Sequence, residues 1–132
     1  FAGAKALAEW KGRVRQGWSG VGVDHVETDG LPDIPELGSS IGIRAFVSLG
    51  ALNPDDVDVQ IVHGRVRNED ELTDLTIKSL TLAETYEHGR HRFEAPVALD
   101  RAGAFGYTVR ILPRHAGLAS PAELGLVAFA HI

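Results

Sequence analysis

Histidine side chains are the strongest candidate metal ligands in this chain, and two of its six histidines lie close together. His88 and His91 form a His-x-x-His pair, which shares one face of a helix but points to opposite faces of a strand. The surrounding sequence EHGRHRF is typical of a turn that enters a strand. We therefore interpret the pair as structural and predict no metal site there.

Acidic residues gather in two groups that could suggest calcium. The first group is Asp55, Asp56 and Asp58, and the second is Glu69, Asp70 and Glu71. Neither group follows the calcium-binding loop, which alternates its oxygen ligands and requires a fixed glycine and a terminal glutamate. Both groups are therefore interpreted as solvated loops.

The sequence also contains no recognised motif for a catalytic nucleophile or a phosphate-binding loop. None of the six serines lies in G-x-S-x-G, and no glycine-rich segment follows a strand and opens a helix. Asp100, Arg101, Arg114 and His115 flank a candidate strand, but no nucleophile accompanies them, so they are interpreted as loop charges. The sequence predicts no catalytic, cofactor-binding or metal-binding residue.

Composition is that of an ordinary folded domain. Of the 132 residues, 44% are hydrophobic and 23% charged, and one core is enough for this length. No apolar run approaches the ~18 residues that cross a bilayer, and the absence of cysteine suits a cytoplasmic protein. Because the chain begins at Phe1 and contains no methionine, we interpret it as a fragment of a larger protein; the alternative is a chain whose first residues are absent.

Charge is unevenly distributed around a net value of -5. Residues 1–20 carry four basic residues against one acid, and residues 21–75 carry twelve acids against three arginines. Phosphate neutralisation supplies most of the affinity for nucleic acid, so an acidic domain without a basic stripe is a poor nucleic-acid binder. We expect neither a nucleic acid nor a membrane as partner.

Residues 2–18 carry the only sustained helical period. The apolar stripe comprises Leu7, Trp10, Val14 and Trp18, at spacings of three and four. Gly17 or Gly20 is predicted to end the helix. We expect the stripe to pack on a protein surface, and a platform for stacking sugar rings is the alternative reading of its two tryptophans.

After Gly20 the apolar period changes to two, which predicts β-strands. Seven candidate strands follow, at 21–27, 41–49, 57–66, 75–82, 92–99, 104–112 and 124–131. Phe46 is an apolar exception on the polar face of its strand, and the phase change between Ile77 and Leu80 predicts a bulge or a strand end. Pro96 cannot donate a ladder hydrogen bond, so its strand should lie on an edge or turn Pro96 outward.

Seven strands without intervening helices predict an all-β fold: an antiparallel Greek-key, immunoglobulin-like β-sandwich with one N-terminal amphipathic helix. The predicted units are a helical lead-in at 1–20 and a β-sandwich domain at 21–132. The acidic segment 68–72 predicts a hairpin tip, and residues 120–123 predict one helical turn. Tyr107 opens its strand after a glycine-containing loop, as in a tyrosine corner, so its hydroxyl is expected to bond the backbone just upstream.

Two stretches carry a resemblance beyond periodicity: LAEWKGRVRQGW at 7–18 and FGYTVRILPRHAGLASPAELGLVAFA at 105–130. They resemble the C-terminal end of bacterial α-glucan (glycogen or maltodextrin) phosphorylases of the actinobacterial type. The resemblance implies a parent enzyme that uses lysine-bound pyridoxal phosphate to phosphorolyse α-1,4-glucan to glucose 1-phosphate. None of Lys5, Lys11 and Lys78 lies in a recognisable cofactor-lysine context, so the cofactor is implied for the parent only.

The resemblance favours a non-catalytic accessory domain with a structural or assembly role. Its expected partner is the rest of the parent chain, through Leu7, Trp10, Val14 and Trp18, with a weak α-glucan contact as a further possibility. Separated from the parent, the stripe is expected to pack on its own sandwich or on a second copy. The alternative is an independent immunoglobulin-like module that binds carbohydrate or protein, with Tyr86 and the two tryptophans as platforms.

Overall fold

The computed structural model describes residues 2–29, 40–67, 71–98, 105–118 and 124–129. Within these residues it contains one α-helix, α1 (Ala2–Gly17), and two short 3-10 helices, η1 (Trp18–Gly20) and η2 (Pro54–Asp56). The strands are β1 (Gly22–Asp29), β2 (Ser40–Ser48), β3 (Val57–Arg67), β4 (Glu71–Ser79), β5 (Thr81–Thr85), β6 (Arg90–Ala98), β7 (Phe105–Pro113) and β8 (Ala128–Phe129).

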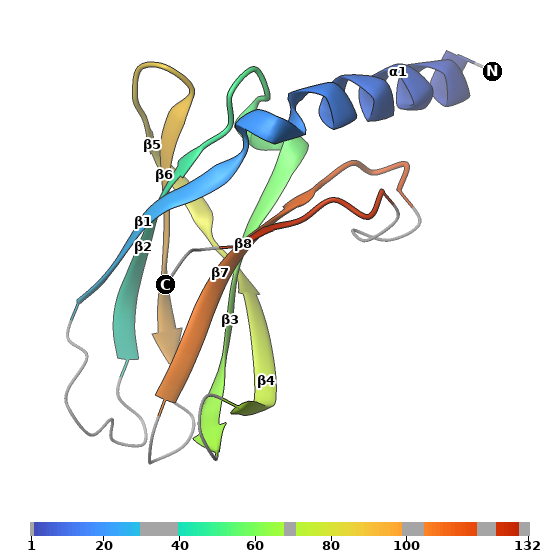
Figure 1. The fold of residues 1–132 in the computed structure, drawn as a ribbon. Coiled ribbons are helices and arrows are strands. Elements are labelled where there is room, and N and C mark those ends of the chain that lie inside the picture. Colours follow the sequence, from blue (N-terminus) through green and yellow to red (C-terminus); the bar gives the residue numbers. More distant parts are fainter. Residues whose placement is uncertain (1, 30–39, 68–70, 99–104, 119–123, 130–132) are drawn as a thin grey trace.

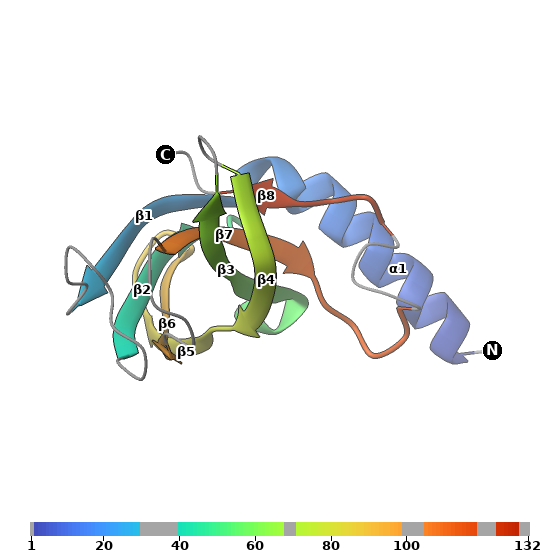
Figure 2. The same ribbon diagram turned by 90° about the horizontal axis from the view of Figure 1, so that it is seen from below.

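The strands form two four-stranded sheets that pack face to face (Figures 1 and 2). One has the order β1-β2-β6-β5 and the other β4-β3-β7-β8, and the paired strands are antiparallel. Helix α1 extends away from one end of the sandwich, with its N-terminus farthest out (Figure 1). The prediction of a mainly antiparallel β fold with one N-terminal helix is confirmed.

Alternating side chains build the core between the sheets. Along β2 the burial of the side chains alternates strictly, and β6 does the same. Fully enclosed side chains from the sheets include Ile41, Ile43, Ala45, Val47, Val57, Val59, Ile61, Val97, Val109 and Ile111. The predicted inward faces of these strands are therefore correct, because a period of two places every second side chain on the same side of a sheet.

The segment 75–82, predicted as one strand, belongs to two strands in different sheets. β4 ends at Ser79 and β5 begins at Thr81. Between them Leu80 is only 6% exposed, and its N–H donates to the Val59 carbonyl at 2.7 Å. The phase change marks a strand end: the chain crosses to the other sheet, and the count becomes eight strands within the described residues.

Pro96 lies where β6 lacks a neighbour on one side. β6 stands between β2 and β5, but the pairing with β5 reaches only from His91 to Glu94. Pro96, opposite Gly42 of β2, is exposed. The predicted outward position of Pro96 is therefore confirmed. β6 is an interior strand, but β5 ends its pairing before Pro96, so no hydrogen bond from Pro96 to β5 is needed.

Several predictions fall wholly or partly outside the described residues. They concern the segment between the first two predicted strands, the predicted hairpin tip at 68–72, of which only Glu71 and Leu72 are described, in β4, and the helical turn at 120–123. The hairpin itself is present, because β3 and β4 pair antiparallel. Tyr107 is half-buried on β7, but residues 99–104 upstream of it are not described, so the tyrosine corner stays a prediction.

Gly89 is expected to tolerate no side chain. Its φ is +72°, and a Cβ there would lie 2.7 Å from the Gly50 carbonyl oxygen. Gly89→Ala is therefore expected to lower the free energy of unfolding by about 2 kcal/mol or more, measured by urea denaturation. Gly12→Ala is the matched control: that site on α1 has open space around it, so alanine should stabilise the chain by up to about 1 kcal/mol. Equal effects of the two changes would contradict the expectation.

Candidate functional site

Helix α1 packs on its own sandwich through the predicted stripe. Trp10 is 8% exposed and Val14 fully buried, and both belong to the core cluster. Leu7 and Trp18 are partly buried against the same cluster. The expectation that the stripe folds against its own sandwich is confirmed, and Trp10 and Val14 are consequently covered by this chain itself.

The carboxylate of Asp56 connects the helix to the sandwich. Asp56 Oδ1 accepts a hydrogen bond from Trp10 Nε1 at 2.9 Å, and the guanidinium of Arg13 binds both carboxylate oxygens at 2.9 and 3.2 Å. The backbone N–H of Asn53 donates to Asp56 Oδ2 at 3.0 Å, and the Asp56 carbonyl accepts from the Arg114 N–H at 2.7 Å. The position and angle of α1 are thereby set by directional bonds as well as by apolar contact.

The interpretation of Asp56 as part of a solvated loop is wrong. Its neighbour Asp55 is fully exposed, but the Asp56 side chain is only 10% exposed. Burial by itself would raise the pKa of the Asp56 carboxyl. Hydrogen bonds from Arg13, the Asn53 backbone and Trp10, together with the charge of Arg13, outweigh burial and lower this pKa below its ordinary value.

His115 lies exposed in the loop after β7, as interpreted, and it also belongs to the helix contact. Its ring lies 4.7 Å from the ring of Trp10, tilted by 47°. The Gly117 N–H donates to His115 Nδ1 at 2.9 Å, and a Cβ on Gly117 would come within 3.0 Å of the Leu7 side chain. The segment after β7 therefore closes over one side of α1. Arg114 fits the earlier interpretation better: its side chain is exposed and approaches Asp55 only at 4.0 Å.

The lowered pKa of Asp56 predicts a specific loss of stability in acid. Since the folded pKa lies below the unfolded value of about 3.9, the ionised carboxylate stabilises the fold above that pH, and this contribution is lost as pH falls through the folded pKa. Melting temperatures measured from neutral pH to below pH ~4 should fall more steeply for the native chain than for Asp56→Asn. Parallel curves would show that Asp56 contributes nothing to the acid response.

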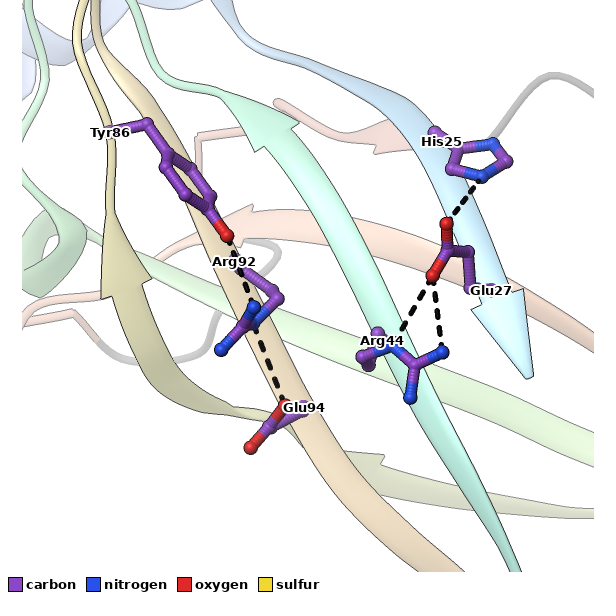
Figure 3. Close-up of polar contacts among 6 residues, drawn as sticks. All are labelled: His25, Glu27, Arg44, Tyr86, Arg92 and Glu94. Atoms are coloured by element: carbon purple, nitrogen blue, oxygen red, sulfur yellow. Dashed lines mark hydrogen bonds and ion pairs between the residues drawn. The ribbon is translucent and has the colours of Figure 1, made fainter. Parts of the chain in front are cut away.

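The face of the β1-β2-β6-β5 sheet that points away from the core carries a ladder of charged side chains (Figure 3). Arg44 on β2 binds Glu27 on β1 at 3.1 Å, and His25 lies 3.3 Å from the same carboxylate. Arg92 on β6 lies 3.4 Å from Glu84 and 3.6 Å from Glu94. Glu27–Arg44 and Glu84–Arg92 are facing cross-strand pairs of opposite charge, which favours these side-chain positions. His25 and Glu94 lie on the same strands as their partners.

The remaining candidate residues do not converge on one centre. His88 lies in the β5–β6 turn with a φ of 62° and is exposed, whereas His91 opens β6 and is 6% exposed. Burial lowers the pKa of His91. Across the described ranges, histidine and acidic side chains form no group of three or more suited to a metal ion, and no described helix is long and apolar enough to span a membrane.

The contribution of Asp56 had a local signal in the sequence. Asparagine followed three residues later by an acid is a capping pattern, in which the acid side chain bonds back to the backbone N–H of the first residue. Asn53 and Asp56 fit this pattern. The partners on the helix, Trp10 and Arg13, lie more than forty residues away in sequence and have no local signature.

Two packed antiparallel sheets with a helix tied to one end define a β-sandwich domain. A family model described as "Glycogen phosphorylase C-terminal domain" matches residues 18–131, and the chain belongs to this family. Similar curated proteins are the glycogen phosphorylases of Mycobacterium bovis (strain ATCC BAA-935 / AF2122/97) and Mycobacterium tuberculosis (strain CDC 1551 / Oshkosh). Each is 42% identical to the chain over 130 residues, which are 98% of this chain and 15% of the relative. The chain thus spans about one-seventh of these relatives' length. No solved structure matches it significantly.

Proposed function

We propose that this chain is a non-catalytic C-terminal accessory domain of an α-glucan phosphorylase and that it serves the structure or assembly of that enzyme. The parent enzyme would cleave α-1,4-glucan with phosphate to release glucose 1-phosphate, in the cytoplasm. Residues 1–20 would be the end of the catalytic body, and residues 21–132 the appended sandwich. The family match over residues 18–131 is the observation that carries the proposal.

The arrangement of α1 supports a structural role. Asp56 anchors the helix through Trp10 and Arg13, so a body joined to this helix would hold the sandwich in a defined orientation. Trp10 and Val14 are buried by this domain itself, whereas Leu7 and Trp18 are only partly buried. Contact with the body would therefore fall to Leu7 and Trp18 among the four stripe residues.

The lysines of this chain do not fit a pyridoxal phosphate site. Lys5 is exposed on α1, Lys11 is half-buried on the same helix, and Lys78 donates to the Pro96 carbonyl. Lys78 lines a hollow with Arg44, Ser79 and Thr81, but this hollow is open to solvent and does not enclose a cofactor. We therefore assign the cofactor to the body of the parent enzyme, outside this chain.

The immunoglobulin-like Greek key is part of the proposal. Its support is the strand order: β1-β2-β6-β5 corresponds to strands A, B, E and D of an immunoglobulin constant domain, and β3-β7-β8 corresponds to C, F and G. β4 would then be an additional strand beside C. The tyrosine corner at Tyr107 belongs to the same proposal.

The test uses the full-length protein whose reading frame contains this chain. Trp18→Ala is expected to lower the melting temperature of the full-length enzyme more than that of the isolated chain, because only the full-length protein would bury Trp18 against the body. Tyr86→Ala, at an exposed ring between β5 and β6, should lower both equally. The isolated chain should release no glucose 1-phosphate from maltoheptaose and phosphate.

Three results would each refute a part of the proposal. Release of glucose 1-phosphate by the isolated chain would show that the domain is catalytic. Equal effects of Trp18→Ala in both contexts would remove the proposed contact with the body. A reading frame without a cofactor-lysine domain would reject the parent activity itself.

A further inference from the structure

Three rings lie in contact across the sheet face that points away from the core. The ring centroids of His25 on β1 and Phe46 on β2 are 5.9 Å apart, with an angle of 30° between the rings. Phe46 in turn lies 6.5 Å from Tyr86, and these two rings are inclined by only 23°. Tyr86 is 38% exposed and Phe46 half-buried. His25, Phe46 and Tyr86, called the aromatic row below, thus present ring surface to solvent.

Tyr86 is held in place before any ligand arrives. Its hydroxyl accepts a hydrogen bond from Arg92 Nη1 at 3.1 Å and donates to Glu84 at 3.3 Å. Figure 3 shows the Tyr86 ring lying along β6 with its hydroxyl directed to Arg92. A ring that is already fixed loses little conformational entropy when a ligand stacks on it, which favours binding.

A surface hollow of about 900 Å³ opens beside the aromatic row. Phe46 and Tyr86 line it with apolar ring surface, and the polar residues of its lining include Asp24, Glu87, His88 and Arg90. Apolar surface combined with a few polar groups is the usual construction of a small-ligand site. The β5–β6 turn forms one wall, where His88 and Gly89 both have positive φ.

Charge in the hollow selects against ions. The lining carries both signs of charge, with the carboxylates of Asp24 and Glu87 beside the guanidinium of Arg90, so neither an anion nor a cation meets a field of one sign. The same side chains can donate and accept hydrogen bonds in several directions. The aromatic ring faces can pack against the C–H groups of a ligand, and the polar side chains around them can bind its hydroxyls. This combination suits a neutral ligand rich in hydroxyls.

We propose that the aromatic row and this hollow form a surface binding site for α-1,4-glucan, in which a pyranose ring stacks on Tyr86 and Phe46. The geometry supports a neutral sugar chain, and the choice of α-1,4-glucan rests on the proposed function. The site would hold the polymer on the surface of this domain.

Binding of maltoheptaose to the isolated chain tests the proposal, by titration calorimetry and by retardation in gels that contain glycogen. Tyr86→Ala is expected to weaken binding about tenfold, because one stacking contact is lost. Tyr86→Phe, which retains the ring, should weaken it by less than about threefold. Phe129→Ala is the matched control, since Phe129 is an aromatic residue 50% exposed on the other sheet. Salt should hardly change the affinity for a neutral ligand.

Failure can be assigned to one proposal or the other. No saturable binding by the native chain, or equal affinity of Tyr86→Ala and native chain, would overturn the glucan site. Equal weakening by Phe129→Ala would place binding elsewhere and overturn it as well. If Tyr86→Ala instead lowers the melting temperature of the full-length enzyme more than that of the isolated chain, the aromatic row is a contact with the body and not a glucan site. If the chain binds glucan but Trp18→Ala lowers the melting temperature equally in the full-length protein and the isolated chain, the glucan site stands and the assembly role is refuted.

Discussion

Asp56→Ala is expected to lower the free energy of unfolding by about 3 kcal/mol, which corresponds to a fall of about 10 °C in melting temperature. The substitution removes the acceptor of Trp10 Nε1, whose indole is 8% exposed, and leaves that buried N–H without a partner. It also removes the bond that closes η2 at the Asn53 N–H. The Arg13 side chain is half exposed and can be hydrated after it loses Asp56. The loss of this ion pair therefore contributes less to the destabilisation than the unpaired Trp10 N–H.

Asp55→Ala is the matched control for this prediction. Asp55 is adjacent in sequence and equally acidic, but its side chain is fully exposed and reaches Arg114 only at 4.0 Å. The control should change stability by less than about 0.5 kcal/mol. Denaturant titration of both variants, followed by tryptophan fluorescence, measures the difference. Similar values for the two variants would mean that α1 is held by apolar packing alone.

Trp10→Ala is expected to cost about 3–5 kcal/mol, the usual range for removing a large aromatic side chain from a core. Trp10 is the bulkiest part of the helix contact, because it packs in the core cluster and against the His115 ring at 4.7 Å. Its loss creates a cavity between α1 and the sandwich and leaves Asp56 with one partner fewer. The helix should then exchange its amide hydrogens faster than the sheets do.

Trp18→Ala in the isolated chain is the comparison. Trp18 is only partly buried and belongs to the periphery of the cluster, so the expected loss is about 1–2 kcal/mol. The double variant of Trp10 and Asp56 should cost less than the sum of the single changes, since both remove the same hydrogen bond. Additive losses would show that this bond contributes nothing to stability.

Most of the strands were predictable because burial imposes a local rhythm. Ile41, Ile43 and Val47 occupy alternate positions of β2 and are buried, and the same alternation in β6 and β7 predicts their inward faces correctly. The helix was equally visible, from Leu7 to Trp18. β5 was harder to recognise: every residue in it is exposed, so no apolar rhythm separates it from a loop, and it was merged with the end of β4.

The candidate sites were less predictable than the strands. Phe46 stood out as an apolar residue on a polar face, but its contacts with His25 and Tyr86 depend on three strands that are adjacent only in the folded sheet. In the sequence, Asp56 is indistinguishable from its neighbours Asp55, which is exposed, and Asp58, which is half-buried. What distinguishes Asp56 is the helix that covers it.

The sequence by itself determined the element types, the faces that enter the core, and the family of the domain, because each of these is recorded in residue periods and in runs of matched residues along one segment. The tertiary structure alone decided which strands pair, where the chain crosses between sheets at Leu80, and which acid is buried. The physical reason is sequence separation: Trp10 and Asp56 are 46 residues apart, and no local pattern records a hydrogen bond that forms only when distant segments pack together.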